Sequence, residues 1–246
     1  MNPLHRWLVT LAAAIATTST ASAQSSEWDR TLLFYLLGAG LDGTAQIGPL
    51  ETDIDQSFSD ILENLDAGFM GAFRASNETW AHTIDAIYMG LESEVTGASG
   101  ASLKAEVDQL LAAYDIGYQL GERFEVLVGA RYNSIELDLM VRGPFEVRNA
   151  SGDKDWIDPY VGFNSTIPFN DKLALVLRAD VGGFDIGAKL AWQAIVRLDW
   201  QFSDTFFGTA GYRILDVDYE DGSGANFFKY DVTTSGPGIG VGWHFR

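Results

Sequence analysis

Hydrophobic and polar residues alternate along several long segments of the chain. Residues 188–203 show the pattern clearly, because every second side chain is apolar and most of those between are polar or charged. The apolar set comprises Trp192, Ala194, Val196, Leu198, Trp200 and Phe202. Successive side chains of a strand point to opposite faces, so this alternation predicts a β-strand with one apolar and one polar face. Similar runs at 110–119, 123–133 and 172–183 predict further strands.

The connections between these runs are of two kinds, and the two kinds alternate. Short polar connections lie at 75–79, 120–123, 168–172 and 202–205. The longer ones lie at 44–64, 95–104, 143–155 and 219–228, with a short one near 182–188. A barrel whose strands run up and down, with tight turns at one rim and longer loops at the other, produces this order. The expected strands lie near 30–43, 65–76, 79–93, 105–120, 123–142, 156–168, 172–183, 188–203, 205–218 and 228–245.

We therefore predict an all-β protein: a closed antiparallel up-and-down transmembrane β-barrel of about ten strands. Eight strands is the alternative, because residues 105–114 also fit a helix. A short helix is expected at 59–65 in the first long loop, where Asp55 or Ser57 can cap its N-terminus. Its apolar side chains, at helical spacing, either cover the barrel mouth or pack on the loop's own strands. They are Phe58, Ile61, Leu62 and Leu65.

The polar faces of the expected strands carry arginines and carboxylates in equal number. Arginine suits pairing with carboxylates, because its planar guanidinium donates two parallel hydrogen bonds. In a barrel whose apolar faces meet lipid, these residues point inward, so we predict an ionic network in the lumen. Its members are Arg74, Asp85, Asp115, Glu125, Arg131, Arg178, Asp180, Arg197, Asp199 and Arg213. The network predicts a plugged or very narrow lumen, and the alternative is a small water-filled pore lined by the same charges.

Aromatic residues gather near the ends of the expected strands. Membrane barrels carry aromatic girdles at both interfaces, so we predict a girdle here. It comprises Trp80, Trp156, Trp192, Trp200, Phe202 and Tyr212. The alternative is a soluble barrel or sandwich, which shows the same alternation with its apolar face inside.

The N-terminus has the pattern of a secretory signal peptide. A basic stretch at His5 and Arg6 precedes an apolar run at 7–16, and Ala21-Ser22-Ala23 fits a cleavage site. We predict a signal peptide at 1–23, removed on export, and a barrel domain at 24–246. The formal net charge of −18 and the lack of a basic stripe argue against nucleic acid as a partner. The chain has no cysteine, so disulfides, thiolate catalysis and sulfur-ligated zinc are excluded.

The last residues, "GIGVGWHFR" (238–246), resemble the C-terminal strand signal of the small outer-membrane β-barrel proteins of Gram-negative bacteria. The resemblance implies that the barrel-assembly machinery reads Ile239, Val241, Trp243 and Phe245 during biogenesis. This chain departs from the pattern at Arg246, one residue past the terminal aromatic. Residues 40–73 also resemble a segment shared by a poorly characterised group of such proteins, which implies family membership rather than an activity.

Catalytic and metal-binding patterns are weak in this chain. After removal of the signal, only His82 and His244 remain, and no serine is paired with either by sequence. Acidic residues crowd 51–66 and 216–221, but their spacing fails the EF-hand pattern. We therefore predict no catalytic, cofactor or metal site.

The predicted role is structural, or an interaction at the cell surface, without enzymatic activity. A narrow passive channel for small solutes is the first alternative, and a barrel enzyme acting on lipid or peptide is the second. The expected partners are outer-membrane lipid, lipopolysaccharide and the assembly machinery, with the protein a monomer in the cell outer membrane.

Overall fold

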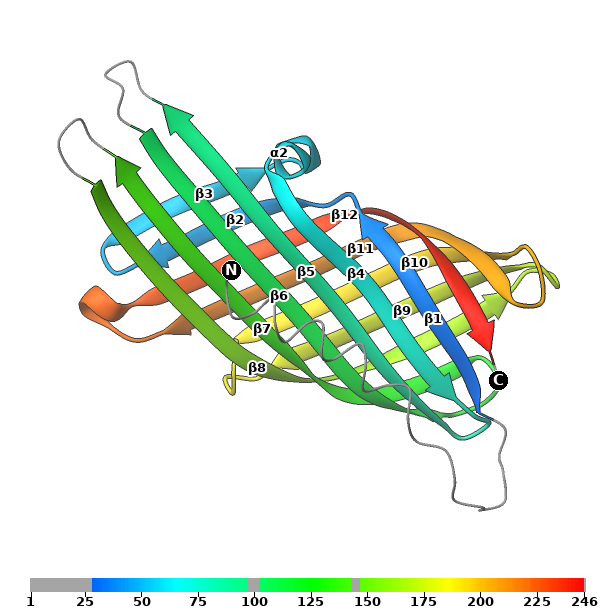
Figure 1. Cartoon of the computed structure of the whole chain (residues 1–246). Helices are drawn as coiled ribbons and strands as arrows, with labels where there is room; N and C mark the ends of the chain where they lie inside the picture. The colour runs from blue at the N-terminus through cyan, green and yellow to red at the C-terminus, as the bar shows by residue number, and fades with distance from the viewer. Residues whose placement is uncertain (1–27, 97–101, 143–146, 246) are drawn as a thin grey trace, which may run out of the picture.

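Ten antiparallel strands close into a barrel in the computed structural model, which describes residues 28–96, 102–142 and 147–245 (Figure 1). β1 pairs with β4 on one side and with β12 on the other, so the sheet closes on itself. The closed antiparallel barrel of ten strands is confirmed, and residues 105–114 are strand rather than helix. The barrel strands are β1 (Asp29–Leu37), β4 (Leu65–Ser76), β5 (Trp80–Thr96), β6 (Ser102–Gln119), β7 (Phe124–Arg142), β8 (Val147–Pro168), β9 (Leu173–Gly183), β10 (Leu190–Gln201), β11 (Phe206–Asp221) and β12 (Phe228–Phe245).

Tight turns join the strands at one end of the barrel, which we call the turn rim. Asn77 shapes the first of them, because its Oδ1 accepts hydrogen bonds from the backbone N–H groups of Thr79 and Trp80 at 2.9 and 2.7 Å. Asn170 has the same role between β8 and β9. An asparagine side chain that bonds backbone two and three residues ahead favours a tight turn. β1 begins and β12 ends at this rim, and the opposite end is called the loop rim.

The predicted first strand, 30–43, is broken in the structure at Gly38 and Ala39. Beyond the break, β2 (Gly40–Ile47) pairs with the N-terminal half of β12, whereas β1 pairs with its C-terminal half. β3 (Leu50–Gln56) then pairs with β2, so much of the predicted loop at 44–64 is a hairpin outside the closed barrel. Acidic residues are uncommon in strands, which is why β3 reads as loop in the sequence. The hydrogen bonds that β12 and β2 supply decide its structure.

β8 also begins earlier than expected, at Val147 rather than near residue 156. Its added half pairs residue by residue with the outer half of β7. β9 pairs with β8 only from Tyr160 onward, so the wall formed by β5 to β8 extends beyond β9 and β10 at the loop rim (Figure 1). The polar composition of 147–155 predicts a loop, and the backbone pairing with β7 overrides it.

The short helix α2 (Phe58–Glu63) follows β3. It begins one residue and ends two residues before the predicted 59–65. Ser57 caps it: its Oγ accepts a hydrogen bond from the Asp60 N–H at 3.3 Å, and its own N–H donates to Asp60 Oδ2 at 3.0 Å. This reciprocal capping box satisfies backbone donors that the helix leaves open. Ser57 Oγ also donates a hydrogen bond to Asp60 Oδ2 at 2.6 Å, and this bond, with the one from the Ser57 N–H, lowers the pKa of the Asp60 carboxyl. Of the two caps considered, Ser57 is therefore the one used.

The apolar side of α2 is only partly covered. Ile61 is buried, and Phe58, Leu62 and Leu65 are exposed. The helix lies against β2 on the outside of the wall, where β4 begins (Figure 1). Among the described residues, no helix is long and apolar enough to cross a bilayer.

The outer surface of the barrel carries an apolar band, which is clear on β8 and β9. On β9 the outward residues from Leu173 to Val181 are all apolar. On β8 the outward face carries Ile157, Val161 and Phe163, all exposed, before it turns acidic at Asp155. Eight residue steps of about 3.3 Å, tilted by about 40°, give a band of roughly 20 Å, close to the ~25 Å of membrane barrels. A soluble barrel would bury these side chains, so the exterior argues for a lipid environment.

Candidate functional site: the charged lumen and its vestibule

Three ion pairs join strands that are not neighbours, so they cross the interior of the barrel. Arg74 on β4 lies 2.5 Å from Glu125 on β7, between Nη2 and Oε2. Arg178 on β9 lies 2.6 Å from Asp115 on β6, between Nη2 and Oδ2. The third pair joins β11 to β5; it is Arg213 Nη1 and Asp85 Oδ2, 3.4 Å apart. Pairing of this kind offsets the cost of taking charges out of water.

A fourth pair lies at the centre of the lumen and is fully buried. Arg131 Nη2 is 2.6 Å from Asp180 Oδ1, and the two side chains are 1% and 0% exposed. Asp180 Oδ2 also accepts a hydrogen bond from Gln193 Nε2 at 2.9 Å and lies 3.7 Å from Arg178 Nε. The Arg131 guanidinium carbon sits 5.0 Å from the centre of the Tyr160 ring, a distance at which cation–π attraction operates.

The fifth pair, Arg197 and Asp199, does not cross the lumen. Both residues are on β10, with Arg197 Nε 3.1 Å from Asp199 Oδ1. All ten residues proposed from the sequence as a lumen network thus lie in ion pairs. The alternation of β-strands brings each of them to the inner face, and the closure of the barrel brings the partners within reach.

The sequence analysis missed the tyrosines that connect these charges. Tyr35 donates to Asp85 Oδ1 at 2.8 Å and accepts from Arg213 Nη1 at 2.9 Å. Tyr160, which is 1% exposed, donates to Asp115 Oδ2 at 2.9 Å. Each tyrosine lies on the face of its strand that points into the lumen. Its position in the alternation was the signal that could have identified it.

Asp158 is a further buried carboxylate that the sequence analysis missed. It is 0% exposed and accepts three hydrogen bonds, from Asn133 Nδ2 at 2.9 Å, Trp156 Nε1 at 3.0 Å and the Ala188 N–H at 2.6 Å. The bond from Ala188 ties the connection between β9 and β10 to the inner wall. Gly187 permits this approach, because a Cβ there would lie 2.3 Å from the Ile157 carbonyl oxygen.

An apolar layer fills the lumen between the ion pairs and the loop rim. We call it the apolar plug, and its side chains come from β5, β6, β7, β8, β10, β11 and β12 and from the β9–β10 connection. It consists of Leu111, Trp156, Ala188, Ala191, Leu215, Val217 and Tyr219, with Ile87, Ile135, Phe228 and Tyr230 packed against it. Because these residues meet from opposite walls, the lumen is filled at this level.

Trp156 corrects one of the predicted girdle positions. It is 6% exposed, points into the apolar plug, and stacks on Tyr219 with ring centroids 4.0 Å apart. Trp156 and Asp158 are two residues apart on β8, so both side chains point to the inner face of the barrel. The sequence had suggested that a strand begins at Trp156, which is why it was expected in the girdle. The other girdle candidates face outward and are 36% to 57% exposed; they are Trp80, Trp192, Trp200, Phe202 and Tyr212.

The closing strand β12 presents large side chains outward and glycines inward. Ile239, Val241 and Trp243 are exposed on the outer face, and Phe245 shares their parity. On the inner face, Gly242 leaves room for the Phe207 ring, whose Cζ would lie 2.0 Å from a Cβ at that position. The four outward residues are those that resemble an assembly signal, and Arg246 lies outside the described residues.

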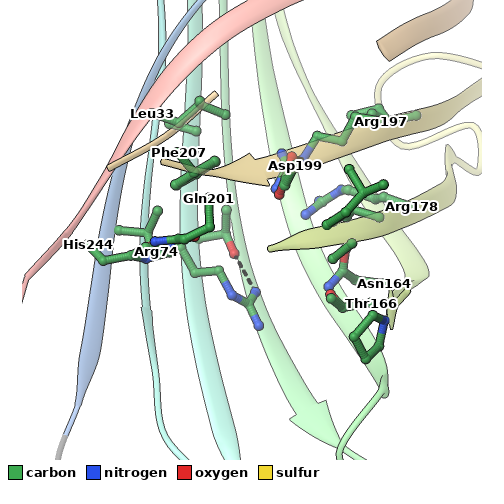
Figure 2. Close-up of a pocket in the computed structure, with 18 of the residues that line it drawn as sticks. Leu33, Arg74, Asn164, Thr166, Arg178, Arg197, Asp199, Gln201, Phe207 and His244 are labelled. Carbon is green, nitrogen blue, oxygen red and sulfur yellow. Dashed lines mark hydrogen bonds and ion pairs between the residues drawn. The ribbon is translucent and has the colours of Figure 1, made fainter. Parts of the chain in front are cut away.

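A cavity of about 750 Å³ opens at the turn rim, on the other side of the ion pairs from the apolar plug. We call it the vestibule. Figure 2 shows Arg74 on one side of it and Arg178 and Arg197 on the other, with His244 near Phe207. The remaining polar lining includes Asp85, Asn164, Thr166, Asp171, Lys172, Asp199, Gln201 and Arg213.

The two histidines occupy different faces of the barrel. His82 Nδ1 is 2.9 Å from the Tyr114 hydroxyl on the outer face, and His244 Nδ1 is 2.9 Å from Thr31 Oγ1 at the vestibule. In the described part of the chain, no group of three histidine or carboxylate side chains is placed to hold a metal ion.

Comparisons with known proteins give similarity of architecture. No family model matches the chain, and no curated protein matches it. The solved structures it is similar to are Gram-negative outer-membrane β-barrels. They include Ail, the attachment invasion locus protein of Yersinia pestis (TM-score 0.42, 11% identity, 89% of this chain and 98% of that one). Another is the translocator domain of the autotransporter NalP from Neisseria meningitidis (TM-score 0.39, 15% identity, 98% and 95%). A third is a Pseudomonas aeruginosa FadL homologue (TM-score 0.37, 9% identity, 89% and 90%).

Proposed function

We propose that the protein is an outer-membrane barrel with a structural or surface-interaction role and no through-pore. The observation that carries this proposal is the filled lumen, in which the ion pairs and the apolar plug follow one another along the barrel axis. Side chains on opposite walls touch in both layers. A solute would have to break buried ion pairs and displace a stacked Trp156–Tyr219 pair in order to pass.

Placement in a membrane is supported by the outer surface. The apolar band, roughly 20 Å tall, is close in height to that of membrane barrels, and the outward positions beyond it are acidic on several neighbouring strands. Glu136 is one of these, and burial, followed by repulsion from Asp108 and Asp153, raises the pKa of its carboxyl. The partners we propose are outer-membrane lipid and lipopolysaccharide at the band, and the assembly machinery at the β12 signal during biogenesis.

A surface-interaction role is supported by the part of the molecule beyond the band. β5 to β8 continue past the ends of β9 and β10, and the β2–β3 hairpin, paired with β12, extends at the same end of the barrel (Figure 1). This wall presents backbone and polar side chains outside the proposed membrane. The proposal includes no catalytic role: His82 and His244 each lie beside a hydroxyl group, but in the described part of the chain neither makes an ion pair with a carboxylate that would orient it as a general base.

The second candidate function is a narrow passive channel, and the vestibule favours it. A cavity of about 750 Å³ already reaches inward from the turn rim, so only the ion pairs and the apolar plug separate it from the loop rim. A channel would require both layers to move aside.

Recording from refolded protein in planar bilayers separates the two functions. The closed barrel predicts no reproducible conductance steps, whereas steps of a defined size would support the channel. Folding is checked on the same sample by gel mobility, which differs between unboiled and boiled membrane barrels. Full solubility without detergent, with no shift in mobility, would overturn the membrane assignment itself.

A further inference from the structure

We propose that the vestibule is a binding site for a small oxyanion, a molecule carrying phosphate or carboxylate groups, with Arg197 as its principal ligand. The inference goes beyond the proposed function, because it concerns a cavity at the turn rim and holds whether or not the lumen conducts. The volume, about 750 Å³, lies within the range of small-molecule sites.

Arg197 has donors that no residue of the described chain uses. Its ion pair with Asp199 is made through Nε, so both terminal nitrogens, Nη1 and Nη2, are left for another acceptor. The side chain is 31% exposed and lines the vestibule. Two parallel N–H groups of a guanidinium match two oxygens of a phosphate or carboxylate.

The strand register places two more arginines beside it. Ile195 on β10 pairs with Arg178 on β9 and with Arg213 on β11, and Arg197 lies two residues further along the same face. Arg197 is therefore the diagonal neighbour of both, at a spacing of about 7–8 Å. Its direct partner on β11 is Gly211, where a Cβ would lie 2.5 Å from the Arg197 Cβ. The missing side chain keeps the space at Arg197 open.

The two flanking arginines are paired with carboxylates from the opposite wall, of which Asp85 also lines the vestibule. Arg178 reaches Asp115, and Arg213 reaches Asp85, each through one terminal nitrogen. Asp115 is 1% exposed and does not line the vestibule. Thr209, which pairs with Asp199 across β10 and β11, lines a small second pocket with Arg197 and Arg213, and its Oγ1 is buried without a hydrogen-bond partner in the described structure. In a chain of net charge −18, this gathering of guanidinium groups is the local exception.

Arg197 and Asp199 allow a test in which two substitutions should change anion binding in opposite directions. It is the carboxylate beside Arg197, so a bound anion competes with it and is repelled by it. We expect R197Q to weaken anion binding by about tenfold or more, since a hydrogen bond to a charged group is lost. We expect D199N to strengthen binding. Arg123, in an exposed turn at the same rim, is the matched control, and R123Q should bind like the wild type.

The measurement is isothermal titration calorimetry of the full chain refolded in detergent, with pyrophosphate in one series and citrate in the other. Binding of either probe that R197Q weakens and D199N strengthens supports the site, and the probe that binds more tightly indicates whether phosphate or carboxylate groups are preferred. Absence of binding by both probes would overturn the proposal, as would equal losses in R197Q and R123Q. Gel mobility confirms that each variant is folded, and bilayer conductance remains a separate readout for the closed lumen.

Discussion

The buried pair at the centre of the lumen allows a quantitative prediction. Replacing Asp180 with asparagine keeps its size but removes its charge, and leaves Arg131, 1% exposed, without its carboxylate at 2.6 Å. Two charges about 4 Å apart attract by roughly 4 kcal/mol at an effective dielectric constant of about 20. Breaking a buried pair by removing one partner costs about 3–5 kcal/mol.

Part of this cost is avoided in D180N, because the amide oxygen that replaces Asp180 Oδ1 still accepts a hydrogen bond from Arg131 Nη2. The contact of Arg131 with the Tyr160 ring is the same in both proteins, so it does not enter the difference. Arg178, the other cation near Asp180, keeps its pair with Asp115. We therefore expect D180N to lower the free energy of unfolding by about 3 kcal/mol, at the lower end of the range for buried pairs.

The assay is guanidinium unfolding in phospholipid vesicles, followed by tryptophan fluorescence. The double variant R131M/D180L tests the reason, because replacing both charges with apolar side chains removes the unpaired charge and should recover most of the loss. The exposed pair Lys154–Asp221 provides the control, and D221N should change stability little. A loss under about 1 kcal/mol in D180N, the size typical of a surface pair, would refute the reasoning. So would a double variant less stable than D180N.

Three further variants test the plug, the helix cap and the closing strand. Trp156→Ala should lower the unfolding free energy by about 3–5 kcal/mol and admit small ions in bilayer recordings, because it removes the largest side chain of the apolar plug. Ser57→Ala should cost about 1 kcal/mol of local stability, measured by hydrogen exchange over 57–64. Because the pKa of Asp60 is lowered in the folded state, its contribution is present at neutral pH and is lost as the pH falls through that lowered value. Gly242→Val should impair barrel closure, measured by gel mobility, and Phe207→Ala should restore it in the double variant, since the Phe207 ring fills the place of the new side chain.

Each of these variants has a result that would count against its reasoning. An unchanged conductance in W156A, together with wild-type stability, would show that the plug does not close the lumen, and Trp200→Ala on the outer face is its control. Hydrogen exchange in S57A equal to that of the wild type at every pH would remove the capping argument. Normal closure of the Gly242→Val variant on its own would remove the argument from ring contact.

The pattern of the sequence by itself determined where most strands run and which face of each is polar. β4 coincides with the predicted 65–76, and both ends of β9 and of β10 lie within two residues of the predicted runs. A strand repeats its faces every two residues, so alternation over a dozen positions identifies both the element and its two sides without any knowledge of the partner strands. The ten residues of the lumen network were identifiable for the same reason.

The tertiary structure decided everything that depends on contacts between distant parts of the chain. Period-two alternation assigns Arg178 to a face, but only closure of the barrel and its strand register bring it to Asp115, 63 residues away. β3 and the first half of β8 have loop-like compositions and become strands because β2 and β7 supply their hydrogen bonds. Trp156 lies inside the barrel because successive residues of a strand point to opposite faces. Its position near an expected strand end has no influence on the face to which it points.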